Sequence, residues 1–135
     1  MFKLNQAILH KRKKKISSNE HKLFNLITRN NHPLHSNNKF AKQSVFKKKV
    51  VNGTFVISII VGLSVEEFSK KCLVNLGYKN IKHLRPVFEG DILKAKTVIK
   101  KIKKYSKKTI ISVITYGINQ HNKIVLTLER TAQFS

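Results

Sequence analysis

The stretch NGTFVISIIVGLSVEEFSK, residues 52–70, decides the fold of this chain. From Gly53 onward its apolar side chains lie on nearly all sides of a helix: Phe55, Val56, Ile59, Ile60 and Leu63. A helix that is apolar all round has to be wrapped by other structure. The apolar run is about half of the ~18–20 residues that a membrane span needs. The stretch therefore predicts a buried central helix and no membrane span.

The sequence after residue 73 changes to the period of two that is typical of strands. Apolar and lysine side chains alternate across residues 91–102, and residues 109–118 and 123–134 are rich in Ile, Val and Thr. Residues 105–108 and 119–122 have the composition of turns between these strands. An antiparallel sheet has one apolar face, on which a fully apolar helix can lie. We therefore predict an α+β chain with the hot-dog arrangement, an antiparallel sheet curled around a central helix.

The segment before this core divides into a basic arm and the start of the domain. Residues 1–16 include the run KRKKK at positions 11–15, and we interpret them as a solvated, frayed arm; a targeting segment and a nucleic-acid tail are the alternatives. Ser17 and Ser18 have the character of a helix start, and a short apolar face then ends near Arg29. A polar loop over residues 30–38 and a helical turn over 39–41 follow. At 135 residues the chain is long enough for one domain, which we place at 17–135.

The charge is far from balanced: 28 Lys and Arg against 6 Asp and Glu give a net charge of +22. Such a surface favours anionic ligands, including the phosphates of a coenzyme A group. Only four of the basic residues are Arg, the residue best suited to bidentate phosphate or base recognition. Two explanations stay open, an A+T-rich genome that enriches Lys, Asn and Ile, and selection for binding a polyanion. The single cysteine, Cys72, indicates a reducing compartment, for which we expect the cytoplasm, with the mitochondrion as the alternative.

Two sets of residues, in order along the chain from about Ser17 to Phe134, resemble a known family. The first set is Thr28, Asn30, Pro33, Leu34, His35, Phe40-Ala41, Val50–Gly53, Pro86-Val87 and Gly90-Asp91. These residues are similar to those of MaoC-like hydratases and dehydratases of the hot-dog superfamily. The second set is residues 61–66, 75–78, 86–88, 117–120 and 130–131, and it resembles the mesaconyl-CoA and itaconyl-CoA hydratase branch. The resemblance implies addition or removal of water at the double bond of a 2-enoyl-CoA, with the site at a homodimer interface.

Adding water to a double bond conjugated to a thioester requires a proton-transfer group and donors for the enolate oxygen. The candidate acid/base is His35, because imidazole titrates near pH 7 and Pro33 stiffens its loop. Asn30 stands where R-specific hydratases carry an aspartate, and an amide can only position water or hydrogen-bond the histidine. Gly53 and Thr54 offer N–H groups at a helix N-terminus to the thioester oxygen, and Asn52 caps that helix or touches the thioester. A glycine needed only for close packing is the equal alternative for Gly53.

The remaining residues give weaker signals. Arg85 is expected either to pair with a substrate carboxylate or to be a surface charge at a strand end, and Asp91 to form a turn. No Cys/His cluster has metal spacing and no Gly-rich phosphate loop is present, so we expect no metal and no cofactor, with acyl-CoA as substrate. The main alternative function is a catalytically inactive hot-dog protein that binds RNA or a ribonucleoprotein through its lysines. A hot-dog thioesterase is a third possibility.

Overall fold

The computed structural model describes all residues, 1–135. The helices are α1 (Ser18–Ile27), α2 (Pro33–Ser36), α3 (Asn38–Lys42), α4 (Gly53–Leu63) and the π-helical turn η1 (Val65–Ser69). The strands are β1 (Ala7–Leu9), β2 (Lys14–Lys15), β3 (Val74–His83), β4 (Ile92–Lys104), β5 (Thr109–Ile118) and β6 (Ile124–Phe134). The three long strands at the C-terminal end lie where the alternating pattern predicts them.

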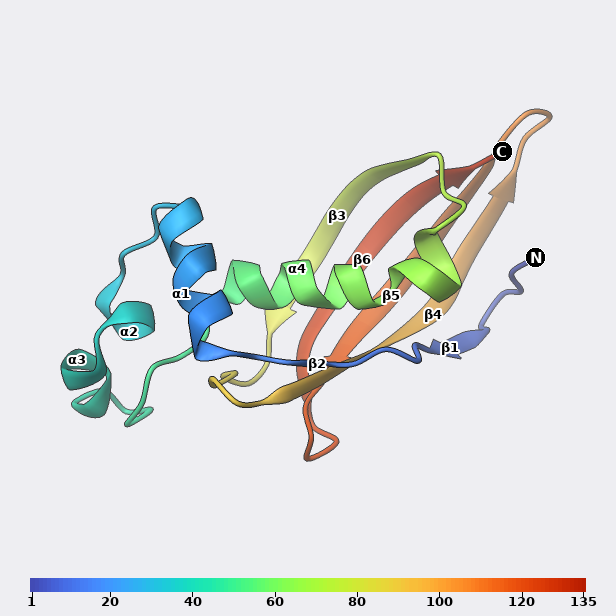
Figure 1. Cartoon of the computed structure of the whole chain (residues 1–135). Coiled ribbons are helices and arrows are strands. Elements are labelled where there is room, and N and C mark those ends of the chain that lie inside the picture. The colour runs from blue at the N-terminus through green and yellow to red at the C-terminus, as the bar shows by residue number, and fades with distance from the viewer.

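The sheet has six strands in the order β1-β4-β5-β6-β3, with β2 also paired to β4, and the pairings are all antiparallel. It curves around α4, while α1, α2 and α3 form a lobe beside the N-terminal end of that helix (Figure 1). The predicted α+β hot-dog arrangement is confirmed.

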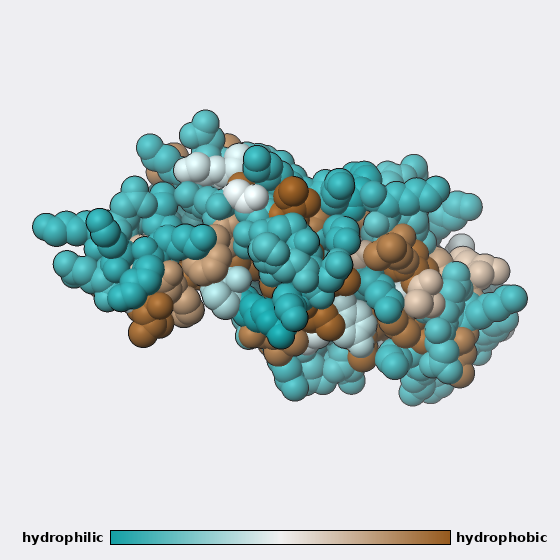
Figure 2. Space-filling model, turned by 90° about the horizontal axis from the view of Figure 1, so that it is seen from below, coloured by the Kyte–Doolittle hydropathy of each residue, from teal (hydrophilic) through white to brown (hydrophobic).

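Helix α4 is buried on one side only. Val56, Ile60 and Leu63 are buried in the main core, with Leu93, Ala95 and Leu128 of the sheet. Phe55 and Ile59, on other sides of the helix, are only partly buried. The helix is therefore covered most completely on the side that faces the sheet, and α1 covers part of another side, where Phe24 stacks on Phe55. Seen from below, the surface is mostly hydrophilic with several separate apolar areas (Figure 2).

The solvated arm predicted for residues 1–16 is also wrong in part. Ala7–Leu9 pairs with β4, and the backbone N–H groups of His10 and Ile16 donate to the carbonyls of Ala95 and Asp91. The Ile16 side chain is 1% exposed. The arm adds strands to an edge of the sheet, and two strands of three and two residues are too short for an alternating pattern to reveal them.

Strand β3 has no counterpart in the sequence prediction. It pairs with β6 along one side, and every one of its residues is exposed. Register shifts at Asn75/Gly77 and Lys79/Lys82 interrupt its alternation. Asn80 adopts a φ of 51° in the second of these irregularities. Bulges of this kind add unpaired residues and erase the period of two that sequence analysis relies on.

No helix of the structure is long and apolar enough to cross a membrane.

Candidate active site

His35 and Gly53 line the same cavity, as the sequence analysis requires. The cavity has a volume of about 370 Å³ and lies where the α2 lobe, the N-terminal end of α4 and the end of β3 meet. Its other lining residues are mainly apolar: Phe46, Val50, Val51, Val56, Leu84, Pro86 and Val87, with His83 and Arg85. An apolar cavity with a few converging polar groups is the usual form of a small-ligand site.

The His35 ring is held in one tautomer by the chain that precedes α4. Its Nδ1 lies 2.6 Å from the carbonyl oxygen of Val50. A carbonyl only accepts hydrogen bonds, so Nδ1 carries the proton and donates it. In the neutral ring Nε2 then has a free lone pair, as a general base requires. The side chain of His35 is half-buried.

Asn30 lies near His35 without a hydrogen bond to it. Its Oδ1 accepts from the backbone N–H of His32 at 3.2 Å, which shapes the turn between α1 and α2. Both Asn30 and His35 line a second hollow of about 680 Å³, together with Lys49 and Glu89. Of the two uses expected for Asn30, a direct hydrogen bond to the histidine is not formed, and positioning of water stays a prediction.

Asn52 is a buried helix cap and is not among the residues that line the cavity. Its side chain Oδ1 accepts from the N–H of Thr54 at 3.0 Å and from the Thr54 hydroxyl at 2.7 Å. Its Nδ2 donates to Asn25 Oδ1 at 3.0 Å, and the residue is 3% exposed. Asn52 therefore caps the helix, which is the first of the two roles expected for it. The Thr54 N–H already donates to Asn52, so it is not free to bind a thioester oxygen. Gly53 keeps the first N–H of α4, which has no acceptor within its own helix.

His83, at the end of β3, was missed by sequence analysis because no pattern linked it to the site. A Cβ atom added to Gly53 would lie 2.8 Å from both Cε1 and Nε2 of His83. The explanation that Gly53 serves close packing therefore has a specific basis, the His83 ring that lies against it. Arg85 reaches the same cavity, with one guanidinium nitrogen donating to the carbonyl of Ile124 at 2.6 Å.

His21, a second histidine that the sequence analysis did not identify, contacts the segment that precedes α4. It is fully buried, and its Nε2 accepts the backbone N–H of Asn52 at 2.9 Å. Its Nδ1 lies 2.7 Å from Glu89 Oε2, and Glu89 also meets Lys49 at 3.4 Å. The spacing of His21, Phe24 and Asn25 on one face of α1 was the available signal, since i, i+3 and i+4 share a helical face.

Burial keeps two histidines uncharged in the folded chain. Desolvation lowers the pKa of His21 below its ordinary 6.5, although the hydrogen bond and charge of Glu89 oppose the shift, and the charges of His35 and Lys49 add to it. Desolvation likewise lowers the pKa of His10, although the hydrogen bond that His10 donates to Glu67 and the charge of Glu67 oppose the shift. His10 is 3% exposed, with Nδ1 2.8 Å from Glu67 and Nε2 2.8 Å from the Thr97 hydroxyl.

These two shifts predict that acid destabilises the fold. As the pH falls, the unfolded chain takes up protons on His10 and His21 before the folded chain does, so the stabilising effect is complete above about pH 7.5 and is lost progressively below about 6.5. Each histidine can lower the free energy of unfolding by at most about 1.4 kcal/mol for each pH unit of acidification. We expect urea unfolding between pH 7 and 5 to show this slope, and the His10→Gln/His21→Gln chain to show a flatter one. The exposed His121→Gln is the control, and a flat profile for the native chain would contradict the prediction.

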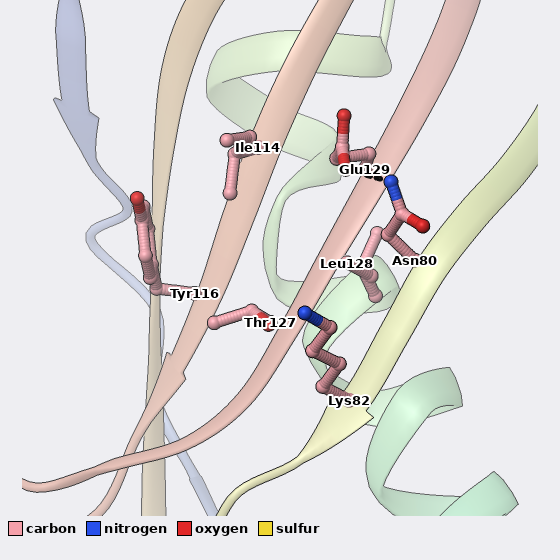
Figure 3. Close-up of a pocket in the computed structure, with 7 residues that line it drawn as sticks. All are labelled: Asn80, Lys82, Ile114, Tyr116, Thr127, Leu128 and Glu129. Carbon is pink, nitrogen blue, oxygen red and sulfur yellow. Dashed lines mark hydrogen bonds between the residues drawn. The ribbon is translucent and has the colours of Figure 1, made fainter.

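A further hollow, of about 360 Å³, crosses the outer face of the sheet (Figure 3). Its lining comes from β3, β5 and β6, and α4 lies behind the sheet in this view. The side chain of Asn80 donates a hydrogen bond to Glu129 at its rim. None of the candidate residues faces this hollow, so it is separate from the site around His35.

The chain is similar to several known proteins. It is 28% identical over 131 residues to mesaconyl-CoA hydratase of Cereibacter sphaeroides, covering 96% of this chain and 38% of that protein. It is 26% identical over 127 residues to beta-methylmalyl-CoA dehydratase of Chloroflexus aurantiacus, covering 93% and 36%. The chain therefore spans less than two-fifths of the length of these curated relatives.

The fold has solved counterparts as well. A conserved Mycobacterium tuberculosis protein described as a double hot-dog fold superposes with a TM-score of 0.88 at 15% identity, covering 98% of this chain and 42% of that one. The family described as "MaoC like domain" matches residues 2–122. The chain thus belongs to the MaoC-like domain family.

Proposed function

We propose that this chain carries the site of a hydratase/dehydratase that adds or removes water at the double bond of a short branched or dicarboxylic 2-enoyl-CoA, similar to mesaconyl-CoA. One observation carries the proposal: His35, with its Nε2 free, and the first amide of α4 border one apolar cavity. The curated relatives named above are a hydratase and a dehydratase of CoA thioesters, which supports the same reaction class.

In this proposal each group has one task. His35 Nε2 removes a proton from water while the water oxygen bonds to the β-carbon. The electron pair of the double bond moves toward the thioester, and the Gly53 N–H stabilises the resulting enolate oxygen. The protonated His35 then returns a proton to the α-carbon, so the ring is neutral again. Asn30 orients the water, and the reverse sequence removes water.

Arg85 supports an acyl chain with a second carboxylate. It is the one arginine that lines the cavity, and a guanidinium can pair with a carboxylate in two parallel hydrogen bonds. The apolar lining accommodates the short branched remainder of the acyl group. The substrate needs no metal or cofactor for this chemistry, because the thioester itself makes the α-carbon acidic.

The test is direct turnover by the purified chain. Loss of absorbance of the conjugated thioester should follow addition of mesaconyl-CoA, itaconyl-CoA or crotonyl-CoA, and we expect mesaconyl-CoA to react fastest. A thiol reagent in parallel reports release of free coenzyme A, which would indicate a thioesterase instead. Absence of turnover with all three substrates would overturn the proposal.

We also propose that the active form is a homodimer built on β3. This edge strand leaves its outer backbone unpaired and exposes Val74, Leu76, Tyr78 and Ile81, the first three by 46–52%. An exposed edge strand with apolar side chains readily pairs with another strand. The cavity lies at the end of the same strand, so a second copy on β3 would close it.

The dimer gives a separate prediction. Leu76→Lys/Ile81→Lys should yield a monomer in sedimentation experiments, because it places like charges across the joined edges. Leu23→Lys/Ile27→Lys is the matched control, with the same added charge on exposed positions of α1. If the native chain and both variants all sediment with the mass of a monomer, the dimer is contradicted.

A further inference from the structure

One end of the sheet holds a dense cluster of lysines. Residues 92–128, which form β4, β5 and the first five residues of β6, contain nine lysines and no Asp or Glu. Six of the nine lie within residues 100–108, at the turn that joins β4 to β5. All six are exposed. We call residues 100–108 the lysine hairpin.

No acidic side chain pairs with the lysine hairpin. Each of the six acidic side chains is engaged elsewhere, in four cases with a basic or histidine side chain. Asp91 accepts from Gln120 and the Phe88 amide, and Glu129 accepts from Asn80. The hairpin therefore carries six positive charges without an ion pair. Such a cluster destabilises a compact chain by self-repulsion unless an anion approaches.

The geometry of the hairpin suits an extended anion. Lys101 and Lys103 pair with Ser112 and Ile110, so their side chains emerge on the same face of β4, about 6.6–6.8 Å apart. Tyr105 stands at the turn, 48% exposed, with the ammonium groups of Lys103 and Lys108 at 5.7 and 5.4 Å from its ring. The tip projects at the end of the molecule opposite the N-terminus of α4 (Figure 1). It is thus remote from the acyl cavity and free to bind a separate partner.

We infer that the lysine hairpin is a docking surface for the phosphate backbone of a nucleic acid. Closely spaced ammonium groups neutralise successive phosphates without the bidentate geometry that an arginine provides. Apart from Tyr105, the large apolar side chain of the lysine hairpin is Ile102, which packs partly buried against the core, so the hairpin lacks the hydrophobic anchor of a membrane-binding segment. Protein interfaces are depleted in lysine, which argues against an acidic protein as the partner.

The test compares two variants that lose the same charge. The hairpin variant changes Lys103, Lys104, Lys107 and Lys108 to Gln, and the control changes Lys11, Lys39, Lys42 and Lys71 to Gln. All eight positions are exposed and outside ion pairs, so both variants should fold as the native chain does, which thermal unfolding checks. Fluorescence anisotropy with a 20-nucleotide single-stranded RNA, the matching DNA duplex and anionic phospholipid vesicles measures binding between 50 and 200 mM salt.

We expect the hairpin variant to bind nucleic acid at least 10-fold more weakly at 100 mM salt, and the control less than 3-fold more weakly. The magnitude of the slope of the logarithm of the association constant against the logarithm of the salt concentration should decrease in the hairpin variant. The decrease should be about 0.7 for each phosphate of a single strand that the variant no longer neutralises, and about 0.9 for each phosphate of a duplex. The tighter of the RNA and DNA probes identifies the source of the phosphates. His35→Ala should bind normally, because the two sites are separate. Equal weakening in both variants, no binding by the native chain at 50 mM salt, or tighter binding to vesicles than to either nucleic acid would overturn the inference.

Discussion

Replacing His35 by alanine should lower kcat for hydration of the preferred enoyl-CoA by about 100- to 10,000-fold, the usual effect of losing a general acid/base. The reason is geometric: Nδ1 is tied to the Val50 carbonyl, so Nε2 is the only ring atom with a lone pair for the water. KM should change little, because the rest of the cavity wall, including Arg85, stays intact. Stopped-flow or steady-state absorbance of the conjugated thioester measures the change.

The controls separate chemistry from folding. His121→Ala removes an exposed histidine from the turn between β5 and β6 and should leave kcat unchanged. His35→Gln retains a hydrogen-bond donor for the Val50 carbonyl but cannot cycle a proton, so it should fold like the native chain and be as inactive as His35→Ala. A kcat within 3-fold of the native value in either His35 variant would show that another group transfers the proton.

Changing Gly53 to alanine should change the free energy of unfolding by less than about 1 kcal/mol, because the ring of the exposed His83 can swing away from the added methyl group. The added Cβ would lie 2.8 Å from two atoms of the His83 ring, closer than any relaxed contact. The same methyl group would stand at the first amide of α4, so we expect kcat/KM to fall at least 100-fold, in the range seen when an oxyanion donor is lost. Chemical unfolding and thioester absorbance give the two quantities.

A double-mutant cycle with His83→Ala distinguishes the two explanations for this glycine. If Gly53 serves only close packing against His83, activity returns in Gly53→Ala/His83→Ala. Our proposal expects activity to stay low in the double variant, because the methyl group still shields the amide. Recovery of full activity in the double variant would remove Gly53 from the mechanism and leave it as a packing residue.

Much of the fold was predictable because it rests on periodicity. Helix α4 and strands β4, β5 and β6 each have a continuous apolar pattern, and their bounds agree with the prediction to within two residues at the strand ends. Strand β3 was not predictable, since its bulges break the alternation and its residues are all exposed. The short strands of the basic arm carry no pattern of their own and are defined by their pairing with β4.

The site was predictable only where a motif marked it. The approach of His35 to Gly53 followed from the resemblance, and the cap formed by Asn52 followed from its position before a helix. His21 and His83 lie in no motif, and each acts through a partner distant in sequence, Asn52 in one case and Gly53 in the other. Contacts of this kind depend on the tertiary arrangement, so a local pattern such as the shared helical face of His21 and Asn25 can mark a residue but not identify its partner.

The lobe of α1, α2 and α3 contributes His35 to the cavity but no strand to the sheet (Figure 1). Its connection to the core includes the buried link from His21 to the Asn52 amide and the Glu89 carboxylate. Segments with few buried contacts open more often than the sheet they rest on. Transient detachment of this lobe would separate His35 from the first amide of α4 while the strands stay folded, and under the proposed function this would give a bulky thioester a route in and out.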